Sequence, residues 1–192
     1  MASLLGTHVW DRTTMGISDD KLHQTTSRWT PAIYFSYKPF ADSDDISLRA
    51  FYKSIFRLPT FNDLYYTEVG NSNLKPENTH QWDLGLIYAH DWYSGLLRHL
   101  ELKADGYFNL VDNKIVAIPK GSGQYRWKMM NVGKVHIAGF EATAEAALRL
   151  HRDWYLLMCL NYTYQSATDH TDPTDNDPYY GTYGKQIAYV PW

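Results

Sequence analysis

Histidine, cysteine and carboxylate side chains are present in this sequence, but their spacing does not match that of common metal sites. The chain has eight His and one Cys, with no His-x-x-x-His or Cys-x-x-Cys pair. A structural zinc site is therefore not expected, and the single Cys159 forms no internal disulfide. His80 and His170 are kept as candidates for contact with haem or an iron chelate. No bound cofactor is predicted.

The acidic residues do not form a recognisable catalytic or calcium-binding pattern. Residues 169–177 carry four Asp but lack the Gly and the distal Glu of an EF-hand loop, so a solvated loop is the better interpretation. The sequence has no nucleophile elbow, phosphate-binding loop or nucleotide fingerprint. A glycoside hydrolase would need a pair of carboxylates in a cleft, and the sequence offers no pair to name. We expect that the protein is not an enzyme.

Composition excludes some partners and favours others. A net charge of −3 argues against nucleic-acid binding. The 16 Tyr and 7 Trp suit either a membrane interface or a sugar-binding surface. No stretch is long and apolar enough for a transmembrane helix, and the first 16 residues, MASLLGTHVWDRTTMG, do not resemble a signal peptide. We treat the 192 residues as one folding unit.

These side chains are carried by segments in which apolar and polar residues alternate with a period of two. They are separated by polar, turn-rich stretches, a pattern that predicts β-strands with one dry and one polar face. The predicted strands are residues 33–37 and 46–53, joined by a turn over 39–45, then 81–88, 99–110, 135–150 and 154–165. Residues 142–150 are also rich in helix formers, but the alternation that continues from residue 135 favours a strand.

The unbroken alternation also predicts which side chains share a face, because one slip of register would reverse every face. One face is expected to hold Leu84, Leu86, Leu102, Phe140, Leu156, Met158 and Leu160, and the other Asp83, Lys103, Glu141 and Asn161. The long strands, with a short turn at 151–153 and long loops at 56–79 and 166–185, are typical of an outer-membrane barrel. The pattern alone leaves a soluble β-sandwich that binds glycans as an alternative.

A resemblance favours the barrel. The stretch FRLPTFNDLYYTEVGNSNLKPENTHQWDLGLIY, residues 56–88, resembles a loop-and-strand segment of TonB-dependent outer-membrane receptors. The matching residues are Arg57, Pro59, Thr60, Asn62, Leu64, Tyr65, Gly70, Asn71, Leu74, Pro76 and Glu77. NVGKVHIAGFEATAEA, with Asn131, Gly133, Gly139 and Glu141, and IAYVP at 187–191 are similar to further segments of the family. The resemblance extends from about residue 33 to the end.

The resemblance implies an all-β fold, an antiparallel meander of long strands that forms a partial segment of a large transmembrane barrel. We expect a poorly defined leader at 1–28, barrel hairpins at 29–165, and a long loop with the start of a further strand at 166–192. The family's plug domain and final strands are not in this sequence, which indicates a fragment. The implied partners are outer-membrane lipid, the TonB complex through the plug, and a scarce nutrient such as an iron-siderophore, haem or a cobalamin.

External loops of such a barrel would hold the ligand. The candidate contacts are Arg57, Asn62, Tyr65, Tyr66, Asn71, Tyr179 and Tyr180. Arg57 and Glu77 could instead pair and tie the ends of one loop together, or remain solvated, and two solvated charges are slightly favoured because exposed pairs contribute little. Tyr65 and Tyr66 could stack on a ligand or anchor at the membrane interface, and interface packing is favoured. Pro59 and Pro76 are interpreted as residues that keep this segment out of the strand ladder.

Overall fold

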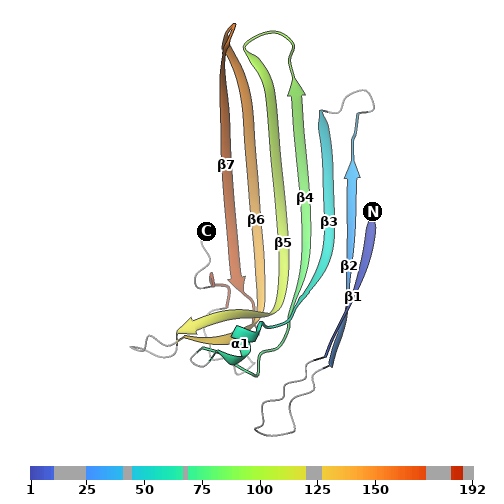
Figure 1. Ribbon diagram of the computed structural model, residues 1–192, viewed down its shortest axis with the longest axis vertical. Helices are drawn as coiled ribbons and strands as arrows, with labels where there is room; N and C mark the ends of the chain where they lie inside the picture. The colour runs from blue at the N-terminus through green and yellow to red at the C-terminus, as the bar shows by residue number, and fades with distance from the viewer. Residues whose placement is uncertain (11–24, 41–44, 67–68, 120–126, 172–182, 188–192) are drawn as a thin grey trace.

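The protein folds into one curved antiparallel sheet whose strands follow one another in chain order (Figure 1). The computed structural model describes residues 1–10, 25–40, 45–66, 69–119, 127–171 and 183–187. Its elements are β1 (Ala2–Trp10), β2 (Thr25–Tyr37), β3 (Ile46–Arg57), α1 (Phe61–Tyr65), β4 (Glu77–Asp91), β5 (Leu97–Pro119), β6 (Trp127–His151) and β7 (Trp154–Asp169). The predicted all-β meander of long strands is therefore confirmed.

The strand registers confirm the predicted faces. Leu84 on β4 lies opposite Gly106 on β5, which lies opposite Phe140 on β6. Leu102 on β5 lies opposite Ala144 on β6, which lies opposite Leu160 on β7. Opposite residues in an antiparallel ladder point to the same side. On the other side, Asp83 lies opposite Tyr107, and Lys103 lies opposite Thr143, which in turn lies opposite Asn161. Glu141 is on β6, two residues from Thr143, and therefore points to the same side. We call these sides the apolar face and the polar face.

Three sequence interpretations do not match the structure. Residues 142–150 lie within β6, so the helical alternative is wrong. The β-sandwich alternative is also wrong, since every strand of the described residues belongs to a single sheet. Within the expected leader, Ala2–Trp10 forms β1 and pairs with β2. The alternation there is weak, because Leu4 and Leu5 point to opposite faces and both are exposed, which explains why no strand was predicted.

Some boundaries also extend further than the sequence indicated. β7 continues to Asp169, beyond the predicted end at residue 165, because Ala167 is fully buried there. Ala167 packs with Val111, Val132 and Val135 in a small core between β5, β6 and β7. The predicted turn at 151–153 is confirmed, since β6 ends at His151 and β7 begins at Trp154.

Two glycines on the polar face allow side chains to cross a strand. Arg49 on β3 reaches over β4 to Asp105 on β5, with Nη2 and Oδ1 2.6 Å apart, and a Cβ at Gly85 would collide with both groups. Tyr107 lies over Gly139 in the same way, and its hydroxyl donates to Gln165 Oε1 at 2.9 Å. Both glycines therefore permit close approach of a side chain to the backbone rather than an unusual backbone conformation.

We expect Gly139→Val to destabilise the protein by about 1–2 kcal/mol, because the new side chain displaces the Tyr107 ring and breaks its hydrogen bond. Thermal unfolding followed by circular dichroism measures the loss. Gly106→Val is the matched control: it lies in the same ladder, but a Cβ there meets only open space. Equal losses for the two variants would show that the Tyr107 crossing contributes nothing.

Candidate ligand-binding rim

One end of the sheet carries the connection between β3 and β4. β3, β5 and β7 all run toward this end, which lies at the bottom of Figure 1 beside α1. The final residues of these strands therefore lie at the same end of the sheet, whereas the turns at 92–96 and 152–153 lie at the opposite end. We call the segment between β3 and β4, residues 58–76, the α1 loop. It is the best-described part of this end.

A capping box fixes the start of the α1 loop. Thr60 Oγ1 accepts a hydrogen bond from the Asp63 backbone N–H at 3.2 Å, and the Asp63 carboxylate accepts one from the Thr60 N–H at 2.8 Å. These two bonds satisfy donors that the first turn of a helix leaves unpaired. Asp63 also pairs with Arg57, with Nη2 and Oδ2 3.3 Å apart. The helix is thus tied to the end of β3.

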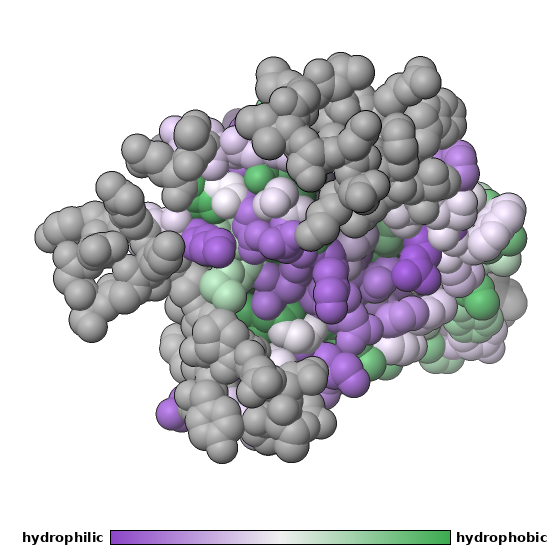
Figure 2. Space-filling model, turned by 90° about the horizontal axis from the view of Figure 1, so that it is seen from below, coloured by the Kyte–Doolittle hydropathy of each residue, from purple (hydrophilic) through white to green (hydrophobic). Residues whose placement is uncertain are grey.

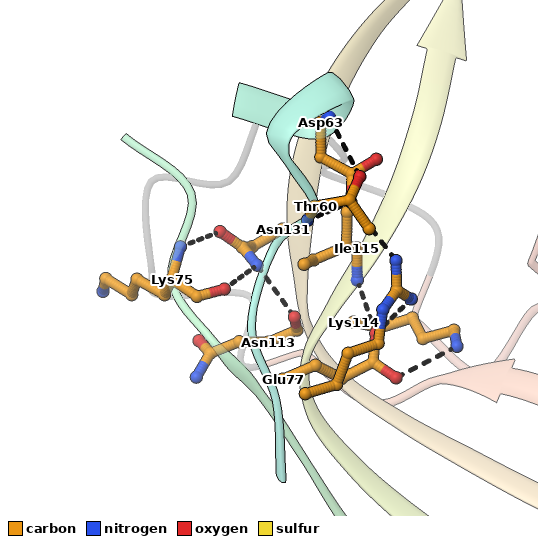
Figure 3. A network of polar contacts seen from close by, with 9 residues as sticks. Thr60, Asp63, Lys75, Glu77, Asn113, Lys114, Ile115 and Asn131 are labelled. Carbon is orange, nitrogen blue, oxygen red and sulfur yellow. Dashed lines mark hydrogen bonds and ion pairs between the residues drawn. The ribbon is translucent and has the colours of Figure 1, made fainter. Parts of the chain in front are cut away.

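Glu77 holds the other end of the α1 loop against β5 (Figure 3). This carboxylate is buried and accepts a hydrogen bond from the Ile115 backbone N–H at 3.1 Å. Lys114 Nζ lies 3.3 Å from Glu77 Oε1, and Arg57 Nη1 lies 3.7 Å from Oε2. The Arg57–Glu77 pair is therefore present, so the favoured expectation of two solvated charges is wrong. The pair belongs to a larger cluster that joins β3, β4 and β5.

Asn131 on β6 holds the α1 loop near its C-terminal end. Its amide donates to the carbonyl oxygens of Lys75 and Asn113, and its side-chain oxygen accepts from the Lys75 N–H at 2.8 Å. Asn113 has a φ of 56°, a left-handed conformation that asparagine tolerates. Asn71 adds a second link, since its amide donates to the Met129 carbonyl at 3.0 Å. The loop is thereby bound to the extended ends of β5 and β6.

The structure separates the predicted contact residues into two groups. Arg57 and Asn71 are engaged in the internal bonds described above. Asn62, Tyr65 and Tyr66 are exposed on and after α1. Tyr179 and Tyr180 lie outside the described residues.

The structure also adds an aromatic residue that the sequence analysis missed. Phe61 is 72% exposed, and its ring lies 4.9 Å from that of Tyr65. The spacing of four residues within a short helix was the available signal. Phe61, Tyr65 and Tyr66 form an exposed group that we call the aromatic tip.

Charged residues line the polar face behind this rim. Arg49 and Asp105 pair across β4, Lys103 pairs with Glu101, and Asp83 and Glu141 share the same side of the sheet. Seen from the rim end, hydrophilic residues gather in the middle of the molecule (Figure 2). A sheet with this face and an opposite face of exposed Leu, Met and aromatic side chains has the layout of a transmembrane barrel wall.

Neither a metal-binding cluster nor a membrane-crossing helix is found among the described residues. No group of three or more His, Cys, Asp or Glu is arranged to hold a metal ion among them. Within the same part of the chain, no helix has the length and apolar character needed to cross a membrane.

Comparisons with known proteins agree with the barrel layout. Residues 6–191 match the family described as TonB dependent receptor-like, beta-barrel. The Vitamin B12 transporter BtuB of Photobacterium profundum is 30% identical over 154 residues, which cover 79% of this chain and 22% of that protein. The protein of the same name from Vibrio vulnificus is 32% identical over 104 residues, 54% of this chain and 16% of that protein.

Solved structures show the same fold. The copper transporter OprC has a TM-score of 0.60 at 23% identity over 89% of this chain and 26% of that one. The Serratia marcescens hemophore receptor HasR, in complex with its hemophore HasA and heme, has a TM-score of 0.52 at 16% identity, covering 86% of this chain and 29% of its own. The chain thus spans roughly a quarter of the proteins that it matches. It belongs to the TonB-dependent receptor β-barrel family.

Proposed function

We propose that this chain forms part of the wall of an outer-membrane receptor that takes up a corrinoid of the cobalamin class. In this proposal the apolar face contacts lipid, the α1 loop lies on the outside of the cell, and import depends on a plug domain and TonB. The curated relatives named as vitamin B12 transporters favour a corrinoid over the other nutrients of the family.

The aromatic tip carries the proposal for ligand contact. Its three rings are exposed at the end of a loop that many hydrogen bonds and ion pairs hold in place. Rigid aromatic side chains provide a large contact area at low entropic cost, which suits a bulky amphipathic ligand. Arg57 and Asn71 support the loop in this proposal rather than contact the ligand directly. Tyr179 and Tyr180 remain candidate contacts from the segment that follows β7.

The test is to replace Phe61, Tyr65 and Tyr66 together with Ala in the full-length receptor. We expect cobalamin binding to whole cells to weaken by about tenfold, because a tenfold change corresponds to about 1.4 kcal/mol, within the range for losing aromatic contacts. Tyr93→Ala is the control, since Tyr93 is 99% exposed at the opposite end of the sheet. Adding Tyr179→Ala and Tyr180→Ala tests the second segment.

The result distinguishes three cases. Unchanged cobalamin affinity at unchanged surface abundance would remove the aromatic tip from the binding site and leave its side chains as interfacial anchors. If the unmodified receptor binds an iron-siderophore or haem but no cobalamin, the receptor assignment stands and the ligand class is wrong. If the full-length protein is absent from the outer-membrane fraction, the assignment to a receptor wall is wrong.

A further inference from the structure

A continuous band of rings crosses the apolar face close to the rim. Successive ring centroids are 5.4 Å apart for Tyr52 and Trp82, 6.1 Å for Trp82 and Phe108, and 5.8 Å for Phe108 and His136. His136 stacks on His170 at 3.8 Å. We call this set the ring band. Aromatic side chains near the end of a barrel strand are expected at a membrane interface. The two imidazoles differ from the other rings because they can also form hydrogen bonds.

A shallow groove of about 600 Å³ opens directly beside the ring band. Trp82 and Phe108 form part of its lining, and the neighbouring Leu84, Ala50 and Gly106 belong to the same face. A Cβ at Gly106 would meet no atom within 4 Å, so the missing side chain leaves a depression between larger neighbours. The lining is mostly apolar, which suits a hydrocarbon chain.

Basic groups lie at the end of the ring band that is formed by His136 and His170. Lys134 is exposed on β6, two residues from His136 and on the same face, and its register partner on β5 is Asp112. His170 follows β7 and brings a second imidazole to this position. Asp112 offsets part of the positive charge of Lys134. His170 Nε2 already lies 3.0 Å from Thr168 Oγ1. The Lys134 ammonium, the His136 ring and the other nitrogen of His170 still supply hydrogen-bond donors beside a groove that takes an apolar chain.

We propose that the groove and the basic group together bind one phosphorylated lipid of the outer leaflet. One acyl chain lies in the groove over Gly106, and the phosphate contacts Lys134, His136 and His170. Basic side chains at the level of lipid headgroups bind phosphates in this way, and the order along the face, apolar groove, aromatic rings and then basic groups, follows the order of a lipid from chain to headgroup. The proposal rests on the proposed function only in that the apolar face lies in a membrane.

The test uses the full-length receptor in nanodiscs with two lipids that share their acyl chains, one with a phosphorylated sugar headgroup and one without the phosphate. Native mass spectrometry measures which lipid stays bound after the nanodisc is removed. We expect the unmodified receptor to prefer the phosphorylated lipid about fivefold, and Lys134→Gln with His136→Gln to lower that preference toward one. Lys75→Gln is the control, because Lys75 is exposed in the α1 loop away from the ring band.

The groove is tested separately. Gly106→Leu places a side chain in the groove, and its Cβ meets no atom within 4 Å. We expect retention of both lipids to fall about threefold through lost contacts. Ala144→Leu adds a similar side chain to the same face outside the groove and should retain lipid normally. Equal retention of the two lipids by the unmodified receptor, or equal effects of Gly106→Leu and Ala144→Leu, would overturn the proposal. Cobalamin binding by the same preparations reports on the proposed function independently.

Discussion

Replacing Leu102 with Arg is expected to destabilise the full-length receptor in a membrane by about 2–4 kcal/mol. Leu102 lies on the apolar face between the ring band and the turn at 92–96, opposite Tyr88 on β4 and Ala144 on β6. In the proposed orientation this position meets hydrocarbon, where a guanidinium loses its hydration without gaining a partner. Reversible refolding into liposomes, followed by Trp fluorescence, measures the change.

Lys103→Ala is the matched control for this prediction. Lys103 is the next residue on β5, but it points to the polar face and pairs with Glu101. Its side chain is exposed to solvent, which screens the ion pair, so its loss is expected to cost far less than the Leu102→Arg change. Leu156→Arg on β7 should behave like Leu102→Arg if it lies at a similar depth. Equal losses for Leu102→Arg and Lys103→Ala would contradict a membrane-facing apolar side.

The sequence was sufficient to predict the two faces because alternation depends only on local backbone geometry. β4, β5, β6 and β7 keep the period of two over most of their length, and pairing preserves it except at the register shifts near Leu97 on β5 and Arg149 on β6. The N-terminal strand escaped prediction because it lacks that contrast and is defined by its pairing with β2. The ends of β5 and β6 escaped for a related reason: their burial comes from contacts with β7 and the α1 loop, which are distant in sequence.

The candidate site was less predictable than the strands. The sequence located the α1 loop and offered an Arg57–Glu77 pair only as the less favoured alternative. It gave no reason to expect that Asn131 would hold Lys75 or that Glu77 would accept from Ile115. These bonds join residues more than thirty positions apart, as the separations of 56 and 38 show. The motif therefore indicated where the loop lies, but not which of its residues are engaged in internal bonds and which are exposed to a ligand.

Replacing Glu77 with Ala should release the α1 loop from β5. The variant leaves the buried Ile115 N–H without an acceptor and Lys114 and Arg57 without their shared carboxylate. We expect the loop's local stability to fall by about 2–4 kcal/mol, since an unpaired buried donor and the lost charged hydrogen bonds each contribute. Hydrogen exchange at Ile115 should then accelerate about 30-fold or more, because each 1.4 kcal/mol is a factor of ten.

Two comparisons decide whether Glu77 acts through the loop. Glu77→Gln keeps an oxygen that can accept from Ile115 but removes the charge, so it should lose less than Glu77→Ala. Lys75→Ala removes an exposed side chain whose backbone alone bonds to Asn131, so hydrogen exchange should stay unchanged. If Glu77→Ala leaves exchange at Ile115 as slow as in the unmodified receptor, the loop is held by Asn131 and Asn71 alone. Weaker cobalamin binding together with faster exchange would instead show that the aromatic tip depends on this buried carboxylate for its position.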